Sequence, residues 1–435
     1  MDATEPDRLD EPDRLDEHDR FDEQEDRLER HDRLDRLQRD PYPLYARARR
    51  AEGLTFVPEL DAWLVARDAD VREVLLRADD FSSAQALRPD VMPSPAAFGV
   101  LAQGFGKRPT VVSTDGPAHR RHRAPLNSRL SAARVTELLP YATDQATALL
   151  DGFVADGRTE LMASYARRLP GAVIGRLIGF DAADVPAAVH GGHRAEQLLF
   201  RPMSEADQCA AAQDVVDLQH LLDRYARARR AEPRDDLCSA MVAALAPGDE
   251  ELTADQRAEL VSNLQNFLIA GHLTTTALIG TTLFHLLRDD RAQWELLCAR
   301  PELIPGAVEE AARFDTAVQG FRRTATRPVT IAGTELPAGA TVFVAYGSAN
   351  RDETRYADSD PAPDVFDITR TPSRHVAFGH GAHGCPGSQL ARGQLRLTLE
   401  LFTRRLPGLR LAKDEEVVMR PTFIHRSPQE LHLTW

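Results

Sequence analysis

The segment from Phe378 to Gly387 constrains this chain more than any other. It reads Phe-Gly-His-Gly-Ala-His-Gly-Cys-Pro-Gly, so four glycines surround one cysteine, Cys385. Glycine lets a backbone adopt unusual dihedral angles and approach a flat ligand closely. A helical pattern resumes directly after Pro386 and Gly387, which places Cys385 at a predicted helix N-terminus. The helix dipole and free N–H groups at such a position stabilise a thiolate, the form in which cysteine donates electron density to iron.

Two other interpretations of Cys385 compete with an iron ligand. A buried structural cysteine is the commonest role of a lone cysteine, but it would not need a glycine-dense surround. A zinc site formed by His380, His383 and Cys385 lacks a visible fourth ligand, and its spacing is not that of a familiar zinc finger. A thiolate ligand of haem iron is therefore the preferred interpretation.

With the next five residues, Ser388 to Arg392, the segment reads Phe-Gly-x-Gly-x-His-x-Cys-x-Gly-x-x-Leu-Ala-Arg. It resembles the haem-ligand signature of the cytochrome P450 superfamily, in particular its soluble bacterial branch, and the resemblance runs from about Pro41 to Trp435. It implies a mainly α-helical, single-domain fold with small β-sheets, in which haem b lies between a distal helix and the cysteine loop. The cofactor contacts implied for the loop are Cys385 as axial ligand and sole metal ligand, Phe378 beside its sulfur, His383 at a propionate and Gly387 against the haem.

Cationic side chains elsewhere in the chain fit the two carboxylates of haem. His119 and Arg123 are four residues apart, which places them on one face of a predicted helix. Alone, such a pair belongs more often to a solvated basic helix. The segment resembles the family helix whose His and Arg bind the haem propionates, and Arg323 matches another propionate-binding position.

Glu310 and Arg313 are three residues apart in a predicted helix, so a salt bridge can join them. Pairs of this spacing are abundant on solvated helices. In this context they resemble the family's ExxR pair, and Arg370 matches the arginine that completes it. The resemblance implies a structural triad that stabilises the scaffold and retains haem.

The segment from Asn266 to Thr276 resembles the oxygen-binding helix of the family. Ala270 and Gly271 are small and leave room for dioxygen, and Thr274 follows Ala270 by four residues, so its hydroxyl can reach the Ala270 carbonyl or a water molecule. The resemblance implies that Thr274 positions water and protons.

Leu273 stands where the family usually has an acid, and leucine cannot relay a proton. Water molecules, Thr274 or His272 could still support an ordinary monooxygenase. Alternatively, the substrate delivers protons, or the reaction is oxidative coupling, desaturation or another departure from hydroxylation. The side chains expected to line the substrate pocket are Phe267, His272, Leu273, Val318, Gln319 and Phe423.

Composition restricts the partners. The net charge of −14 argues against binding to nucleic acids or to anionic membranes, because no basic surplus exists to neutralise phosphates. No uninterrupted apolar run reaches the roughly 18 residues that cross a bilayer. Four widely spaced cysteines indicate reduced thiols, so we expect a cytoplasmic protein, most simply a monomer.

The first 40 residues repeat the triplet Asp-Arg-Leu or Asp-Arg-Phe. The apolar residues of the repeats fall six or seven positions apart, and six residues advance a helix by about 600°, so these side chains do not form one stripe. We expect residues 1–40 to form a disordered or fraying helical tail, with a partner-docking arm as the alternative. Residues 41–435 are expected to form the catalytic domain.

These observations predict a haem-thiolate monooxygenase that oxidises a small-molecule or carrier-tethered substrate, such as an intermediate of antibiotic or other specialised metabolism. Electrons would come from ferredoxin and its reductase or from a flavoprotein. Arginines such as Arg392 and Arg396 could contact this acidic partner. From another class of function, a noncatalytic haem-binding or ligand-binding protein is the alternative.

Overall fold

The computed structural model describes residues 32–358, 360–413 and 415–435. This part of the chain is mainly helical with small sheets, which confirms the fold class predicted from sequence. The helices are α2 (Tyr42–Arg50), α3 (Asp68–Leu76), α4 (Pro95–Leu101), α5 (Gly116–Arg129), α6 (Ala132–Asp151), α7 (Arg168–Ile178), α8 (Val185–Phe200), α9 (Glu205–Ala231), α10 (Leu237–Leu245), α11 (Ala254–Leu287), α12 (Ala292–Ala299), α13 (Ile304–Phe314), α14 (Tyr346–Ala349) and α15 (Ser388–Arg405).

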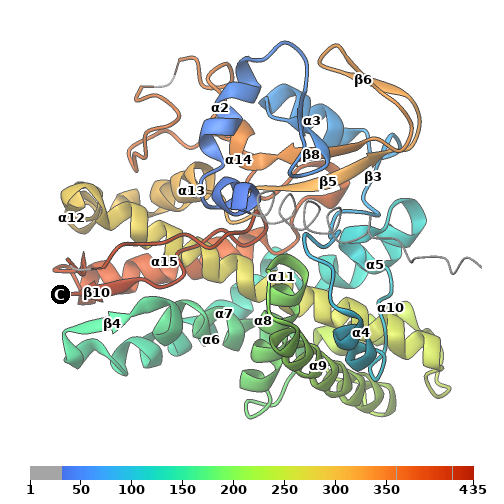
Figure 1. The fold of residues 1–435 in the computed structure, drawn as a ribbon. Coiled ribbons are helices and arrows are strands. Elements are labelled where there is room, and N and C mark those ends of the chain that lie inside the picture. Colours follow the sequence, from blue (N-terminus) through green and yellow to red (C-terminus); the bar gives the residue numbers. More distant parts are fainter. Residues whose placement is uncertain (1–31, 359, 414) are drawn as a thin grey trace, which may run out of the picture.

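The larger sheet has five strands in the order β1-β2-β8-β5-β3, with only the β2–β8 pair parallel. Smaller sheets have the orders β4-β10-β9 and β6-β7. In Figure 1 the five-stranded sheet lies with α2, α3 and α14 in the upper part, and α4 to α10 occupy the lower part. The strands are β1 (Thr55–Val57), β2 (Ala62–Val65), β3 (Phe81–Ser82), β4 (Arg158–Glu160), β5 (Gly320–Ala325), β6 (Val329–Ile331), β7 (Thr334–Leu336), β8 (Thr341–Ala345), β9 (Arg410–Leu411) and β10 (His432–Thr434).

Helix α11 crosses the middle of the molecule beside α15 (Figure 1). It begins with a capping box, in which Thr253 and Gln256 each accept a hydrogen bond from the other's backbone N–H. By length and composition this is the one helix of the described residues that could cross a membrane, but most of its apolar stretch is buried. It packs against α7, α8, α9, α13 and α15, so α11 is a core helix.

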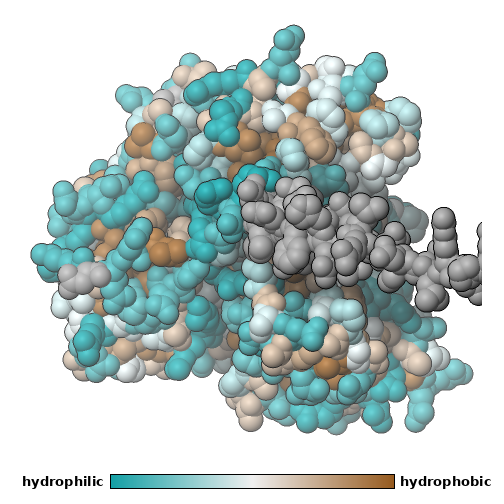
Figure 2. Space-filling model, viewed as in Figure 1, coloured by the Kyte–Doolittle hydropathy of each residue, from teal (hydrophilic) through white to brown (hydrophobic). Residues whose placement is uncertain are grey.

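The face of the molecule drawn in Figure 2 is mainly hydrophilic, with apolar residues in small groups.

Gly271 allows α11 to pack closely against α7. A β-carbon at this position would overlap the Ile174 side chain. The glycine therefore has a packing role in addition to the space that sequence analysis assigned to it.

We expect Gly271→Ala to lower the free energy of unfolding by about 1–3 kcal/mol, the usual effect of overpacking a core. Ile174→Val should restore part of the loss in the double variant, because it shortens the side chain that is overlapped. Thermal unfolding of the haem-loaded protein measures both effects. Gly99→Ala is the matched control, because a β-carbon there meets open space. An unchanged Tm for Gly271→Ala would contradict the packing role.

The structure describes the last part of the expected N-terminal tail. Residues 32–39 form a helix, in which Leu34 and Gln38 are buried. The Gln38 side chain donates a hydrogen bond to Asp90, and Arg426 donates to the Arg39 carbonyl at 2.6 Å. These partners lie far away in the sequence, so the repeat pattern alone could not reveal them. Residues 1–31, the rest of the expected tail, lie outside the described residues.

Candidate active site

A cavity of about 270 Å³ lies between α11 and the loop that precedes α15, and its lining is mostly apolar. Cys385 lines it from the loop, and of the chain's four cysteines it alone is exposed. This exposure is to the interior cavity, because the thiol lies deep within the protein. The Cys385 N–H donates to the Phe378 carbonyl at 2.8 Å, which closes the loop around the thiol.

Two of the glycines in the loop are required by its backbone. Gly379 and Gly381 have φ angles of 71° and 68°, in the left-handed region that side chains disfavour. At Gly381 a β-carbon would also lie against the Leu75 carbonyl oxygen of α3. The glycine-rich sequence thus places the loop tightly on α3 and keeps the thiol open to the cavity.

Burial acts against ionisation of the Cys385 thiol. Burial raises the pKa of the Cys385 thiol above its ordinary value, although the Gly387 N–H and the charges of Arg123 and Arg392 act in the opposite direction. A metal ion that coordinates a thiol deprotonates it outright.

The zinc site considered from sequence is not present in the structure. His383 lies beside Ser83, with its Nε2 atom 3.0 Å from the Ser83 hydroxyl oxygen. The only group of three ligand atoms close enough for a metal within the described ranges is Glu415, Glu430 and His432, which does not include Cys385.

Arg392 stabilises the loop from α15. Its guanidinium group lies 4.2 Å from the centre of the Phe378 ring and donates two hydrogen bonds, of 2.6 and 2.9 Å, to Glu309. Glu309 also lies 3.2 Å from His375. Arg392, whose side chain is 26% exposed, is thus engaged within the protein, whereas Arg396 pairs on the surface with Glu400. A contact of either arginine with an electron donor stays a prediction. Sequence analysis missed Glu309, although it directly precedes Glu310.

Four predicted cationic residues gather beside the cavity. The rings of His119 and His383 lie with their centres 4.2 Å apart and are tilted by 43° to each other. Arg123 and Arg323 line the cavity, as does His383. Burial and the charge of Arg323 lower the pKa of His383 to about 4, and burial with the charge of Arg123 lowers that of His119. This end of the cavity therefore carries the charges of Arg123 and Arg323 beside two neutral imidazoles.

This arrangement fits the carboxylates of haem. The Nε2 atom of His119 is buried and has no hydrogen-bond partner in the described structure. An anionic group here would accept its hydrogen bond and compensate the charges of Arg123 and Arg323. Together with the apolar cavity and the accessible thiol of Cys385, the residues present fit a haem with its propionates at this end.

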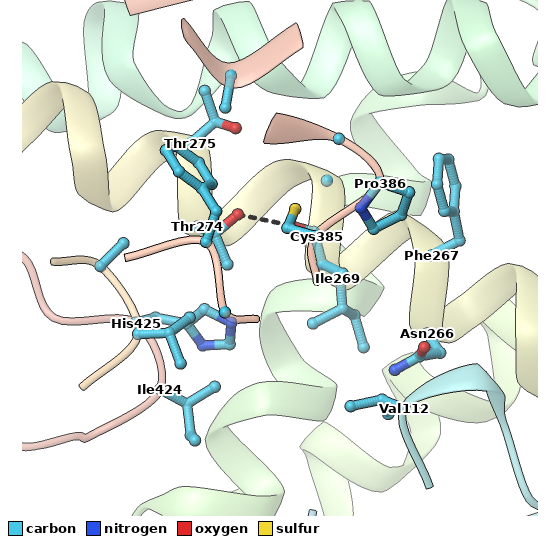
Figure 3. A pocket seen from close by; sticks show the side chains of 18 of the residues that line it. Val112, Asn266, Phe267, Ile269, Thr274, Thr275, Cys385, Pro386, Ile424 and His425 are labelled. Carbon is cyan, nitrogen blue, oxygen red and sulfur yellow. Dashed lines mark hydrogen bonds between the residues drawn. The ribbon is translucent and has the colours of Figure 1, made fainter. Parts of the chain in front are cut away.

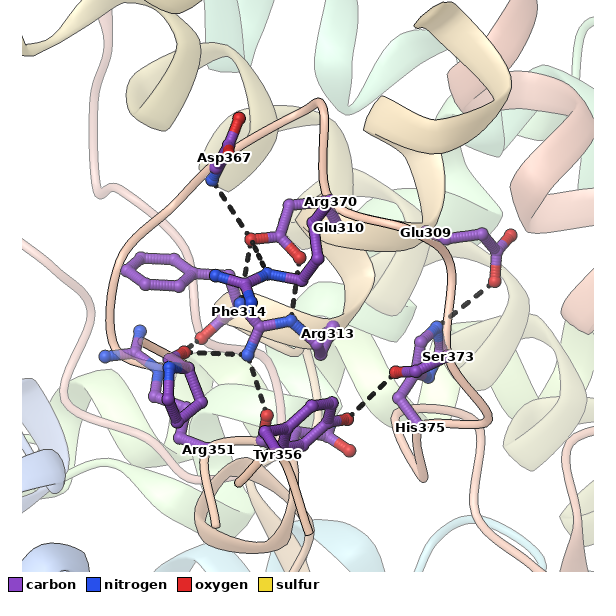
Figure 4. A network of polar contacts seen from close by, with 12 residues as sticks. Glu309, Glu310, Arg313, Phe314, Arg351, Tyr356, Asp367, Arg370, Ser373 and His375 are labelled. Carbon is purple, nitrogen blue, oxygen red and sulfur yellow. Dashed lines mark hydrogen bonds and ion pairs between the residues drawn. The ribbon is translucent and has the colours of Figure 1, made fainter. Parts of the chain in front are cut away.

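Glu310, Arg313 and Arg370 lie together, beside Asp367 (Figure 4). Arg313 donates hydrogen bonds of 2.7 and 2.8 Å to the two Glu310 oxygens, and Arg370 lies 3.3 Å from one of them. All three side chains are buried. Their remaining N–H groups donate to carbonyl oxygens, Arg313 to Asn350 and Pro363 and Arg370 to Pro361, Ala362 and Val365. The triad thus fixes the segment that leads into the cysteine loop.

On α11, Ala270, Gly271 and Thr274 line the cavity. The Thr274 hydroxyl donates to the Ala270 carbonyl at 2.6 Å. Thr274 and Cys385 point into the same space (Figure 3). A hydroxyl group and a thiol from two distant segments therefore share one mostly apolar cavity.

The predicted substrate residues divide into two groups. Phe267 and Val318 line the cavity, whereas His272, Leu273, Gln319 and Phe423 do not. The His272 Nε2 atom lies 3.0 Å from the Arg167 carbonyl oxygen, because two residues advance a helix by about 200° and turn it away from Ala270. Leu273 is 2% exposed and is turned about 100° from Thr274.

Gln319 and Phe423 are held in the protein interior. The Gln319 side chain donates to the Thr316 carbonyl and to the Tyr42 hydroxyl. Phe423 packs against Phe343 of β8, with ring centres 5.2 Å apart. The neighbouring Ile424 and His425 line the cavity instead, so the prediction for this segment was wrong by one residue.

Sequence analysis also missed Glu196 of α8, which lines the cavity although it is fully buried from solvent. Glu196 precedes Leu198, Leu199 and Phe200 near the end of an amphipathic helix, a pattern that does not mark it as a cavity residue. Only the position of α8 against the cavity identifies it as a pocket residue.

Comparisons with known proteins agree with this geometry. The family model described as Cytochrome P450 matches residues 197–421. Nocardicin C N-oxygenase of Nocardia uniformis subsp. tsuyamanensis is 36% identical, and mycinamicin IV hydroxylase/epoxidase of Micromonospora griseorubida is 35% identical; each alignment covers 86% of this chain and 90% of the relative.

Solved structures show the same fold. Cytochrome P450 CREJ in complex with (4-ethylphenyl) dihydrogen phosphate has a TM-score of 0.83 at 29% identity, covering 92% of this chain and 98% of that one. P450BioI in complex with an acyl carrier protein that bears hexadec-9Z-enoic acid has a TM-score of 0.79 at 27% identity, covering 92% and 99%. The chain therefore belongs to the cytochrome P450 family and is a monooxygenase that uses haem as its cofactor.

Proposed function

We propose that this enzyme hydroxylates a small-molecule intermediate of specialised-metabolite biosynthesis. The observation that carries the proposal is the single, mostly apolar cavity shared by Cys385, Ala270 and Thr274. Such a lining favours an apolar substrate oriented by few polar contacts. The names of the oxygenase and hydroxylase relatives support a substrate of this class.

We propose a role for each part of the site. Cys385 binds the haem iron, Phe378 and Gly387 pack around that ligand, and His119, Arg123, Arg323 and His383 bind the propionates. The chemistry supplied by bound haem is the activation of O₂ and oxidation of the substrate. The Thr274 hydroxyl holds a proton at Oγ1, and the apolar walls exclude bulk water.

The proposed electron donor is a ferredoxin with its reductase, or a flavoprotein, in the bacterial cytoplasm. A carrier-tethered substrate is an extension of this proposal, supported by the solved relative in complex with an acyl carrier protein.

The experiment that tests the function is a screen for substrate-induced spin-state shifts of the haem, using metabolites of the protein's own gene neighbourhood. A compound that shifts the spectrum should also be oxidised when NAD(P)H and a donor system are added. Failure of every binding compound to be oxidised would contradict the proposal.

Thr274→Val is expected to lower the amount of product formed per NAD(P)H consumed by about 100-fold. This is the lower end of the usual effect of removing a side chain that positions a proton. The substitution keeps the shape of the side chain but removes the hydroxyl that donates to Ala270. Thr274→Ser, which retains the hydroxyl, should keep most of the product yield. Equal yields for the valine and serine variants would show that the hydroxyl has no part in proton delivery.

A second candidate is oxidative coupling or desaturation, because Leu273 replaces the usual acid. The variant Leu273→Glu would not distinguish hydroxylation from coupling or desaturation, because position 273 is buried outside the cavity lining. A buried carboxylate there would also lower the stability of the fold. Isotope-labelled O₂ separates them. Hydroxylation incorporates the label into the product, whereas desaturation or coupling does not.

A further inference from the structure

A cluster of buried charged side chains lies where α8 and the C-terminal segment enclose the cavity. The Arg420 guanidinium donates to Oε2 of Glu196 at 2.8 Å, and Nε of Arg201 lies 4.0 Å from the same oxygen. On the other side of the carboxylate, Nδ1 of His425 lies 3.6 Å from Oε1. Glu196 and His425 line the cavity, and Figure 3 shows His425 beside Ile424 at its wall.

This cluster is incompletely paired. In the described part of the chain, Oε1 of Glu196 and Nδ1 of His425 are buried and lie 3.6 Å from each other, too far apart for a direct hydrogen bond. Neither atom has another hydrogen-bond partner there, and Nε and Nη2 of Arg201 and Nε of Arg420 are likewise buried without one. Burying an unpaired polar atom is unfavourable, so such atoms usually indicate a missing partner. The Glu196–Arg420 ion pair ties α8 to the C-terminal segment through Oε2, so this structural role leaves Oε1 unaccounted for, in a residue that lines the cavity.

The charge balance restricts the missing partner. Although burial alone would raise the pKa of Glu196, the charge of Arg420 holds it well below its usual value, so the carboxylate is ionised. Burial and the charge of Arg420 lower the pKa of Arg201 to about 10, which reflects a local surplus of positive charge. Burial likewise lowers the pKa of His425, which is therefore neutral.

Each charged type of substrate group is disfavoured by one part of the cluster. A substrate ammonium would find the Glu196 charge already compensated by Arg420 and Arg201. A substrate carboxylate would meet Glu196 itself at the cavity wall. A neutral hydrogen-bond donor of the substrate is compatible with both residues. Oε1 of Glu196 accepts a hydrogen bond, and the neutral imidazole of His425 can accept or donate one.

We propose that Glu196 and His425 determine substrate specificity by binding a neutral hydroxyl or amide N–H of the substrate where α8 and the C-terminal segment enclose the cavity. This inference rests on the proposed function and names the substrate class: a mostly apolar molecule with one neutral donor group. Arg420 is a positioning residue, because it holds the carboxylate through Oε2 and leaves Oε1 for the substrate.

Binding of a matched probe series to the haem-loaded enzyme tests the proposal without turnover. Each probe carries an imidazole, which binds haem iron and shifts its visible spectrum, on an alkyl chain of graded length. The free end is methyl, hydroxyl, carboxylate or trimethylammonium. At the best chain length, the hydroxyl probe should bind roughly tenfold more tightly than the methyl probe, as a hydrogen bond to a charged group predicts.

The variants Glu196→Gln and His425→Phe should each reduce this preference for the hydroxyl probe, and Ile424→Val should retain it. Ile424 is the matched control because it lines the same wall without a polar atom. The reduced, CO-bound spectrum of each variant shows whether it has folded and loaded haem, and His425→Phe keeps the test usable if Glu196→Gln does not fold. Equal binding of the hydroxyl and methyl probes, or tighter binding of the carboxylate or trimethylammonium probe, would overturn the inference. These results differ from a failure of the proposed function. In that case no bound compound is oxidised, whichever probe binds most tightly.

Discussion

Cys385→Ser is expected to remove the red-shifted Soret band of the reduced, CO-bound protein and nearly all oxygenase activity. That band is characteristic of a cysteinate ligand, and a serine oxygen cannot replace the electron donation of the sulfur. We expect the rate of substrate oxidation to fall at least roughly 1000-fold, equivalent to about 4 kcal/mol in activation free energy. Difference spectroscopy of the reduced protein with and without CO measures the first effect, and product formation measures the second.

Cys209→Ser is the matched control for this experiment. Cys209 is partly exposed and does not line the cavity. Its substitution should leave both the band and the activity unchanged. A red-shifted band that persisted in Cys385→Ser would mean that another thiol binds the iron, and Cys385 would lose the role proposed for it.

The sequence predicted best those features that depend on residues close together in the chain. The spacing of Glu310 and Arg313 determines that both lie on one helix face, and the structure joins them by two hydrogen bonds. The glycines of the Cys385 loop similarly restrict its backbone before any tertiary contact is considered. Local geometry of this kind is independent of how distant segments pack.

Features that depend on packing between distant segments were predicted less well. Whether Phe423 or His425 faces the cavity is decided by the contact of Phe423 with β8, about which the local sequence carries no signal. Glu196 becomes a pocket residue only because α8 lies over the cavity. The helix at residues 32–39 is ordered against the C-terminal segment, nearly 400 residues away.

Leu273 illustrates how the structure changes a question raised by sequence. The leucine departs from the family pattern, and its position beside Thr274 suggested a place in the substrate pocket. In the structure it is buried outside the cavity lining, so the side chain is not placed to contact a substrate in this cavity. The polar groups that do reach the cavity from outside α11 include Glu196 and His425, and these define the polarity offered to a substrate.

Glu310→Gln is expected to lower the free energy of unfolding by about 3–5 kcal/mol, the usual effect of removing one member of a buried ion pair. The substitution keeps the size of the side chain but removes the carboxylate charge that the buried Arg313 and Arg370 both contact. Because Arg370 also holds the segment before the cysteine loop through three carbonyl oxygens, haem retention should fall together with stability.

Thermal unfolding and the ratio of haem to protein after gel filtration measure these two effects. Glu400→Gln is the matched control, since it breaks the exposed pair with Arg396 and should change stability by no more than about 0.5 kcal/mol. The two glutamates differ in burial, with side chains 2% and 46% exposed, so the contrast isolates the effect of a buried charge. If Glu310→Gln kept its haem and its Tm, the backbone contacts of Arg313 and Arg370 would be sufficient to hold the loop. The triad would then not be the element that retains the cofactor.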